Sequence, residues 1–150
     1  GKVFGQIHQL TTIQNPWQKD LLEFFGLAKG DPRFIFPGFI TDGELVYLYK
    51  NAKANLLVSR DEGFGFSFIE ASSQETPSLL SDIPILHEIS QDAALFVDEK
   101  KPEEIAEKIK SLMTNEDLRK TLGQEAKERS RFFLSASFKN ALDKVIRSSL

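Results

Sequence analysis

Cysteine is absent from the 150-residue chain, and histidine occurs only twice, at His8 and His87. The lack of cysteine excludes disulfide bonds, a thiolate nucleophile and zinc sites with thiolate ligands. Neither histidine has a second candidate ligand at the spacing of a metal site, so we expect no metal. A chain without cysteine also fits a reducing compartment, and we expect a cytoplasmic protein.

Long apolar runs and a strong charge of one sign are lacking too. No apolar stretch approaches the ~20 residues that span a bilayer, and the first residues lack the basic and then apolar profile of a signal peptide. The formal net charge of −3 gives no basic footprint for nucleic acid. We therefore expect a soluble protein without a nucleic-acid partner. The opening segment, GKVFGQIHQL, has strand-like residues and no methionine, and we expect a fragment that begins within a domain.

What the chain does contain is an alternation of short apolar runs and amphipathic helical patterns. Strands are predicted over residues 2–7, 33–39, 54–59, 77–81 and 93–97, and helices over 15–27, 41–52, 66–74, 102–113, 115–129 and 135–148, with a short segment at 84–89. Strands separated by helices pair in parallel, because parallel strands need a crossover connection. We predict one α/β domain over residues 1–150, a Rossmann-like open parallel sheet with helices on both faces.

In such a sheet the ligand site lies at the carboxyl ends of the strands. The loops predicted to lie there follow Phe36, Ser59, Leu80 and Val97. The loop after Ser59 carries the stretch EGFGFSFIE, which runs from Glu62 to Glu70 and places two carboxylates around two glycines. This loop is the strongest candidate for a functional site.

The residue types in this stretch suit a phosphate and two sugars. Gly63 and Gly65 permit backbone geometry that a side chain would block, and a helix begins near Phe66. The unpaired N–H groups at a helix N-terminus bind anions, so the amides from Gly63 to Ser67 form a candidate phosphate cradle. Carboxylates on both sides of a diphosphate could each accept hydrogen bonds from sugar hydroxyls. Taken as a bare spacing, the same two acids are better explained as solvated residues of a loop and a helix.

A longer block favours the interpretation of these two acids as site residues. It runs from Phe36 to Asp98 and reads FPGFITDGELVYLYKNAKANLLVSRDEGFGFSFIEASSQETPSLLSDIPILHEISQDAALFVD. It resembles the C-terminal, donor-binding domain of family 4 retaining glycosyltransferases of the GT-B type (glycosyl transferases group 1). The resemblance implies that Glu62 is the catalytic carboxylate, which contacts and orients the donor sugar rather than acting as a nucleophile. It implies that Glu70 holds the ribose hydroxyls. The residues that it assigns to donor binding are Gly38, Phe39, Ile40, Gly63, Phe64, Gly65, Phe66, Ser67 and Glu70.

The same resemblance also implies the substrates, the partner domain and the location of the whole enzyme. The substrate would be a nucleotide-diphosphate sugar, with no obligatory metal or other cofactor, and the acceptor would be a glycan, a lipid or a polysaccharide precursor. The family's first strand and its phosphate-gripping loop should lie upstream of Val3, so we expect the first strand to be missing. An N-terminal acceptor-binding domain is the expected partner, and the isolated chain is expected to be inactive without it. The whole enzyme is expected in the cytoplasm, with peripheral association at the inner face of the membrane.

The family usually has glycine before Thr-Pro, where this chain has Glu75. A larger, charged residue there must turn outward or perturb the packing of helix against strand. Among the aromatic residues of the loop, we expect Phe66 and Phe68 to pack in the core. His87 and Glu88 are expected on the surface of a helix near the donor site.

Two other functions remain open on these residues. The first is a binding or interaction module of the same fold that binds nucleotide without catalysis. The second is a phosphate-handling regulatory domain of another α/β class. That class would need an acidic pocket at a strand end, where only Asp61, Glu62 and Asp82 are available.

Overall fold

The structure is a computed structural model that describes residues 16–133. The chain divides into two compact units, Gly1–Asp42 and Gly43–Leu150, and each is described by itself. The strand predicted over residues 2–7 and the helix predicted over 135–148 lie outside the described residues.

The first unit is described from helix α1 (Pro16–Ala28) onward, and its side chains pack through aromatic rings. The ring of Phe25 lies 4.9 Å from that of Phe36, and Phe24 meets Phe34 edge to face at 5.8 Å. The strand predicted over residues 33–39 is wrong, because these residues adopt no regular structure. A strand needs a partner for its backbone groups, and the described part of this unit contains no other strand. A turn that the Phe34 N–H closes on the Asp31 carbonyl oxygen, 3.0 Å apart, also precedes the run.

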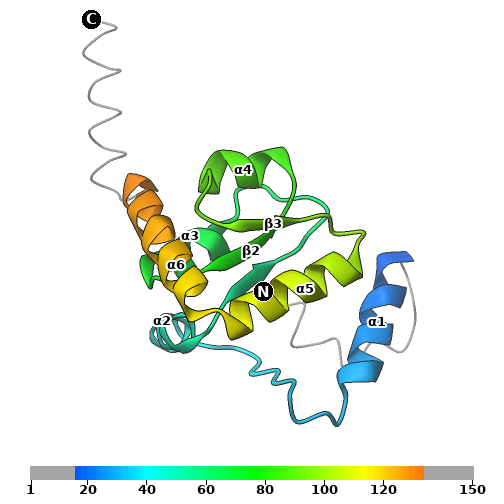
Figure 1. Ribbon diagram of the computed structural model, residues 1–150. Coiled ribbons are helices and arrows are strands. Elements are labelled where there is room, and N and C mark those ends of the chain that lie inside the picture. The colour runs from blue at the N-terminus through cyan, green and yellow to red at the C-terminus, as the bar shows by residue number, and fades with distance from the viewer. Residues whose placement is uncertain (1–15, 134–150) are drawn as a thin grey trace, which may run out of the picture. The chain divides into compact units, whose positions relative to one another are not determined.

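The second unit is built on a three-stranded parallel sheet in the order β1-β2-β3 (Figure 1). The strands are β1 (Asn55–Leu57), β2 (Ser78–Ser81) and β3 (Leu95–Val97). Leu79 of the central strand pairs with Leu56 on one side and Leu95 on the other. These strands lie within the predicted ranges 54–59, 77–81 and 93–97, so the predicted α/β fold with an open parallel sheet is confirmed.

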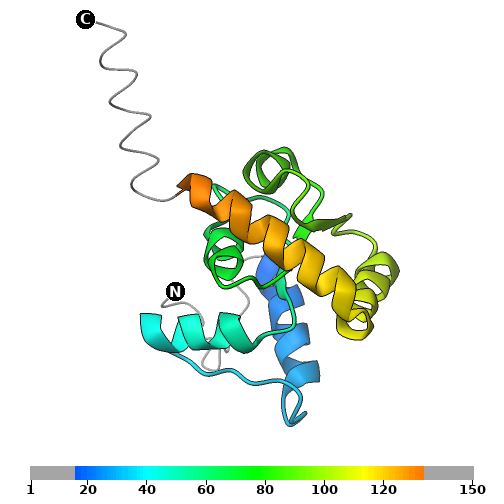
Figure 2. The same cartoon turned by 60° about the vertical axis from the view of Figure 1, so that its left-hand side comes forward.

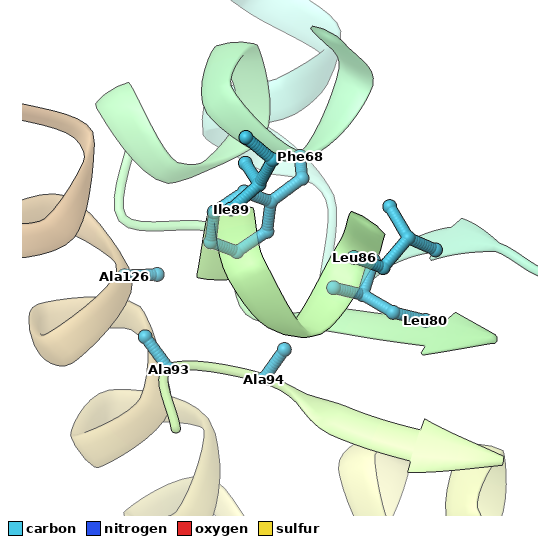
Figure 3. Close-up of a cluster of buried hydrophobic side chains, with 7 residues drawn as sticks. All are labelled: Phe68, Leu80, Leu86, Ile89, Ala93, Ala94 and Ala126. Carbon is cyan, nitrogen blue, oxygen red and sulfur yellow. The ribbon is translucent and has the colours of Figure 1, made fainter. Parts of the chain in front are cut away.

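Helices cover both faces of this sheet, as predicted. Successive residues of β2 point to opposite faces, so each face has its own core. Leu80 belongs to a core with Phe68, Leu86, Ile89, Ala93, Ala94 and Ala126, which Figure 3 shows. Leu79 belongs to a second core with Val97, Leu112 and Leu122. The helices are α2 (Asp42–Asn51), α3 (Phe66–Ser73), α4 (Pro84–Ser90), α5 (Pro102–Thr114) and α6 (Glu116–Ser130), followed by the short 3-10 helix η2 (Arg131–Phe133).

Serine hydroxyls lie at both ends of β2 and join it to the β1 segment. The Asn55 side-chain amide donates to Ser78 Oγ over 3.1 Å. At the other end, the backbone N–H of Ser59 donates to Ser81 Oγ over 2.7 Å. Both serines are completely buried, so these bonds satisfy hydroxyls that water cannot reach.

Helices α3 and α6 lie side by side (Figure 2). Glu75, just beyond the end of α3, closely approaches Gly123 of α6. A Cβ atom on Gly123 would lie only 2.2 Å from the carbonyl oxygen of Glu75. Glu75 itself has a left-handed φ of 60°, and its exposed carboxylate pairs with Lys127 of α6. Of the two outcomes predicted for Glu75, an outward turn or perturbed packing, the side chain shows the outward turn.

Candidate functional site

The loop between β1 and α3 lies at the carboxyl edge of the sheet and carries the predicted glycines. Gly65, the residue before α3, has a φ of 81°, and a Cβ atom there would lie 2.8 Å from Leu86 Cδ2 of α4. The left-handed conformation favours glycine, and a side chain there would also displace the flexible end of Leu86. Gly63 has open space around it and no left-handed backbone. The prediction that a side chain is blocked is therefore confirmed for Gly65 and wrong for Gly63.

A pocket of about 420 Å³ lies on this loop. It is lined by Leu57, Glu62, Gly63, Phe64, Gly65, Phe66 and Ser67. Every residue of this lining except Leu57 was predicted from the sequence as a site residue. The structure thus brings six of the predicted residues around one pocket at the N-terminal end of α3.

A buried hydroxyl in the pocket wall lacks a partner. Ser67 Oγ is inaccessible to solvent and makes no hydrogen bond to any residue between 16 and 133. Buried polar atoms are normally paired, and Ser67 lies in the first turn of α3, where backbone N–H groups are also unpaired by helix geometry. The end of α3 therefore offers hydrogen-bond donors to an anion in the pocket.

Glu62 is oriented by a serine that the sequence analysis did not assign to the site. Ser59 Oγ donates to Glu62 Oε1 over 3.0 Å, while the Ser59 N–H is bound to Ser81 of β2. The half-buried carboxylate is thus connected to the sheet through one intermediate residue. The spacing of three residues in a tight loop was a usable signal, because such a hydroxyl can reach back to the chain near it.

Glu70 lies one turn into α3, is exposed, and is not part of the pocket lining. The phenolic O–H of Tyr49, from α2, donates to Glu70 Oε2 over 3.2 Å. Burial of the phenol, followed by the charge of Glu70 and the hydrogen bond between them, raises the pKa of Tyr49 to about 12. Tyr49 is separated from Glu70 by 21 residues, and no local pattern could have indicated this contact.

The two phenylalanines expected in the core behave differently. Phe68 is completely buried, as predicted, but Phe66 is 69% exposed at the pocket. Residues two apart on an α-helix point to nearly opposite sides, so only one of the pair can face the core. Phe66 instead contacts Phe64, with ring centroids 4.9 Å apart, and its assignment to the core is wrong.

Gly38, Phe39 and Ile40 belong to the first unit and are described apart from the pocket. Gly38 has a left-handed φ of 72°, and Phe39 is 92% exposed. Their predicted role in binding the donor stays a prediction.

His87 and Glu88 lie exposed on α4, as predicted for surface residues. His87 Nε2 lies 2.6 Å from Asp82 Oδ1, just after β2, and the imidazole stacks on Phe96 of β3 with centroids 3.8 Å apart. Over the described residues, no group of three or more acidic or histidine side chains could hold a metal ion. None of the described helices has the length and apolar character needed to cross a membrane.

Comparison with known proteins agrees with this geometry. The chain is 45% identical over 58 residues to the O-antigen chain mannosyltransferase RfbU of Salmonella typhimurium, a match of 39% of this chain and 16% of that protein. It is 37% identical over 70 residues to the serotype-specific mannosyltransferase WbdA of Escherichia coli, a match of 47% of this chain and 9% of that one. The chain therefore spans a small part of these relatives.

A solved structure supports the fold. Sucrose-phosphate synthase from Thermosynechococcus elongatus superposes with a TM-score of 0.72 and 19% sequence identity, over 99% of this chain and 43% of that chain. The likeness agrees with the predicted Rossmann-like fold of GT-B enzymes. The family described as "Glycosyl transferases group 1" matches residues 14–129. This match spans most of the chain, and the protein belongs to the glycosyl transferases group 1 family.

Proposed function

We propose that this chain is the donor-binding domain of a retaining glycosyltransferase that takes a sugar from a nucleoside-diphosphate sugar. The observation that carries the proposal is the pocket on the loop before α3. It combines the N-terminal end of a helix, an unpaired buried hydroxyl at Ser67 and a carboxylate at Glu62. A nucleotide sugar needs both anion binding and hydroxyl recognition at one place.

The anion-binding part of the pocket suits the leaving group of the reaction. When the bond to the anomeric carbon breaks, negative charge develops on the departing diphosphate. Preorganised N–H and O–H donors stabilise such charge more than a mobile solvent does. In this chain the amides at the start of α3 and the Ser67 hydroxyl supply these donors.

The two carboxylates have separate tasks in this proposal. Glu62, which Ser59 orients, binds hydroxyl groups of the donor sugar at the pocket. Glu70, one turn further along α3, binds the ribose hydroxyls of the nucleotide. Their spacing along α3 and its preceding loop sets the two sugars on opposite sides of the diphosphate.

The names of the relatives favour one substrate class. RfbU is named an O-antigen chain mannosyltransferase and WbdA a serotype-specific mannosyltransferase, so we propose a mannosyl donor and an O-antigen polysaccharide acceptor. The partner is proposed to be an N-terminal acceptor-binding domain, since the chain spans only part of its relatives. We propose that the enzyme works in the cytoplasm, at the inner face of the membrane, without an obligatory metal.

Calorimetric titration of the chain with UDP, GDP, ADP and their sugar conjugates tests the proposal. We expect saturable binding of one nucleotide, weakened about tenfold or more by Glu70→Ala, because the ribose hydroxyls lose their charged acceptor. Glu62→Ala should weaken binding of the sugar conjugate more than binding of the free nucleoside diphosphate. Glu107→Ala, an exposed acid of α5, serves as the matched control. Binding that neither site variant changes would contradict the proposal.

A further inference from the structure

We propose that Tyr49 is a positioning residue that holds Glu70 in the orientation that binds ribose. The inference rests on the proposed function of Glu70 and extends it to a second helix, α2. It is carried by the hydrogen bond from the Tyr49 phenol to Glu70 Oε2, 3.2 Å long, which joins α2 to α3.

Tyr49 is itself held in place at its backbone. The hydroxyl of Thr76, a buried residue just beyond α3, donates to the carbonyl oxygen of Tyr49 over 2.6 Å. The N–H of Thr76 in turn donates to the Ala71 carbonyl oxygen of α3 over 3.0 Å. The phenol thus reaches Glu70 from a backbone that is already tied to the same helix, which fixes the point from which the side chain extends.

The protonation of Tyr49 suits this task. A tyrosine phenol keeps its proton at neutral pH, and the pKa of Tyr49, raised to about 12, extends this to more alkaline solution, so the O–H can donate to the carboxylate. An exposed glutamate on a helix otherwise samples several rotamers, and the loss of that freedom on binding costs affinity. With Oε2 held by Tyr49, Oε1 remains oriented to accept from the ribose hydroxyls.

The test compares Tyr49→Phe with Tyr47→Phe in the 150-residue chain. Tyr47 lies on the same helix and is 67% exposed, so its variant removes a hydroxyl without touching Glu70. Each variant is titrated with the nucleoside diphosphate that binds best among UDP, GDP and ADP, and with the 2′,3′-dideoxy analogue of that nucleotide. The melting temperature of each variant is measured alongside.

We expect Tyr49→Phe to lower the affinity for the ribonucleotide about two- to tenfold, the range for one hydrogen bond. Its affinity for the dideoxy analogue should be unchanged. Combined with Glu70→Gln, it should add little further loss, since both changes act on one contact. Equal weakening of both nucleotides would show a structural role and overturn the inference. The inference would also be overturned if Tyr49→Phe left the affinity for the ribonucleotide unchanged while Glu70→Gln lowered it. If the wild-type chain binds none of the three nucleotides, the proposed function fails, and this inference fails with it.

Discussion

A residue with left-handed backbone conformation lies near each end of α3, and the two differ in what surrounds them. The chain has a left-handed φ before the helix at Gly65, 81°, and after it at Glu75, 60°. At the first end a Cβ atom would meet the flexible end of the Leu86 side chain, which would have to move to make room. At the second end a glutamate side chain points to solvent, and it is Gly123 of α6 that leaves room for the carbonyl group of Glu75. The comparison teaches that a left-handed position can carry a side chain, at a cost in backbone energy, where that side chain points to solvent.

The largest effect is expected from Gly123→Ala. The new methyl group would lie 2.2 Å from a backbone oxygen, which cannot rotate away, so α6 must move from α3. We expect the free energy of unfolding to fall by about 2 kcal/mol or more, because overpacking outweighs the better helix propensity of alanine. Urea denaturation measures the change.

Gly43→Ala is the matched control for this change. Gly43 lies in α2 and has nothing within 4 Å of its added methyl group. We expect it to raise stability by about 0.5–1 kcal/mol, the gain from helix propensity alone. Similar losses for both variants would refute the close approach of α6 to Glu75.

Gly65→Ala should have the next largest effect. The left-handed conformation costs a residue with a side chain about 1–2 kcal/mol, but Leu86 Cδ2 is the end of a flexible side chain that can yield. We expect a loss of about 1–2 kcal/mol in the free energy of unfolding and weaker binding of nucleoside diphosphates, measured by calorimetry. Gly63→Ala, with open space and no left-handed backbone, should keep wild-type stability. A smaller loss for Gly65→Ala than for Gly63→Ala would contradict this account of the loop.

Glu75→Gly sharpens the comparison from the other side. Glycine removes the cost of the left-handed backbone, and only an exposed ion pair with Lys127 is lost. We expect a small rise in melting temperature. Glu75→Ala loses the ion pair and keeps the backbone cost, so it should melt below the wild type. A melting temperature for Glu75→Gly below that of Glu75→Ala would show that backbone strain is not released there.

The pH dependence of the Glu75 pair should be the smallest effect. The hydrogen bond and charge of Lys127 hold the pKa of the Glu75 carboxyl below its ordinary value of 4.5. A lowered pKa in the folded state means that the pair stabilises the fold above pH 4.5 and that this contribution is lost as the pH falls through the lowered value. The difference in melting temperature between wild type and Glu75→Gln should therefore be present at pH 7 and disappear in acid. A difference that grows in acid would contradict this assignment.

Features that depend on local sequence could be predicted, and those that depend on distant contacts could not. The strands of the sheet and the start of α3 follow from apolar runs, glycine and helical periodicity within a few residues. The run at residues 33–39 has the same apolar character as β1 but forms no strand, because strand formation also needs a partner for the backbone. Local composition carries no information about that partner.

The features of the site also divide into those set by local sequence and those set by distant contacts. The six pocket residues lie within one loop and the first turn of α3, so their proximity was predictable from chain connectivity. The contact of Tyr49 with Glu70 depends on how α2 packs against α3, which the order of residues along either helix does not reveal. Phe66 shows the limit of residue type as a guide, since its place on the helix, rather than its hydrophobicity, exposes it.

The buried hydroxyls at the two ends of β2 have a consequence for the accuracy of the site. A shift of β1 by one residue relative to β2 would move its end by about 3.3 Å and remove the partners of Ser78 and Ser81 together. The misaligned sheet would then hold two unpaired hydroxyls in its interior, each costing about 1–3 kcal/mol. Because Glu62 is connected to Ser81 through Ser59, the same shift would displace its carboxylate from the pocket. A register error that misplaces this carboxylate therefore also leaves buried hydroxyls of the central strand unpaired.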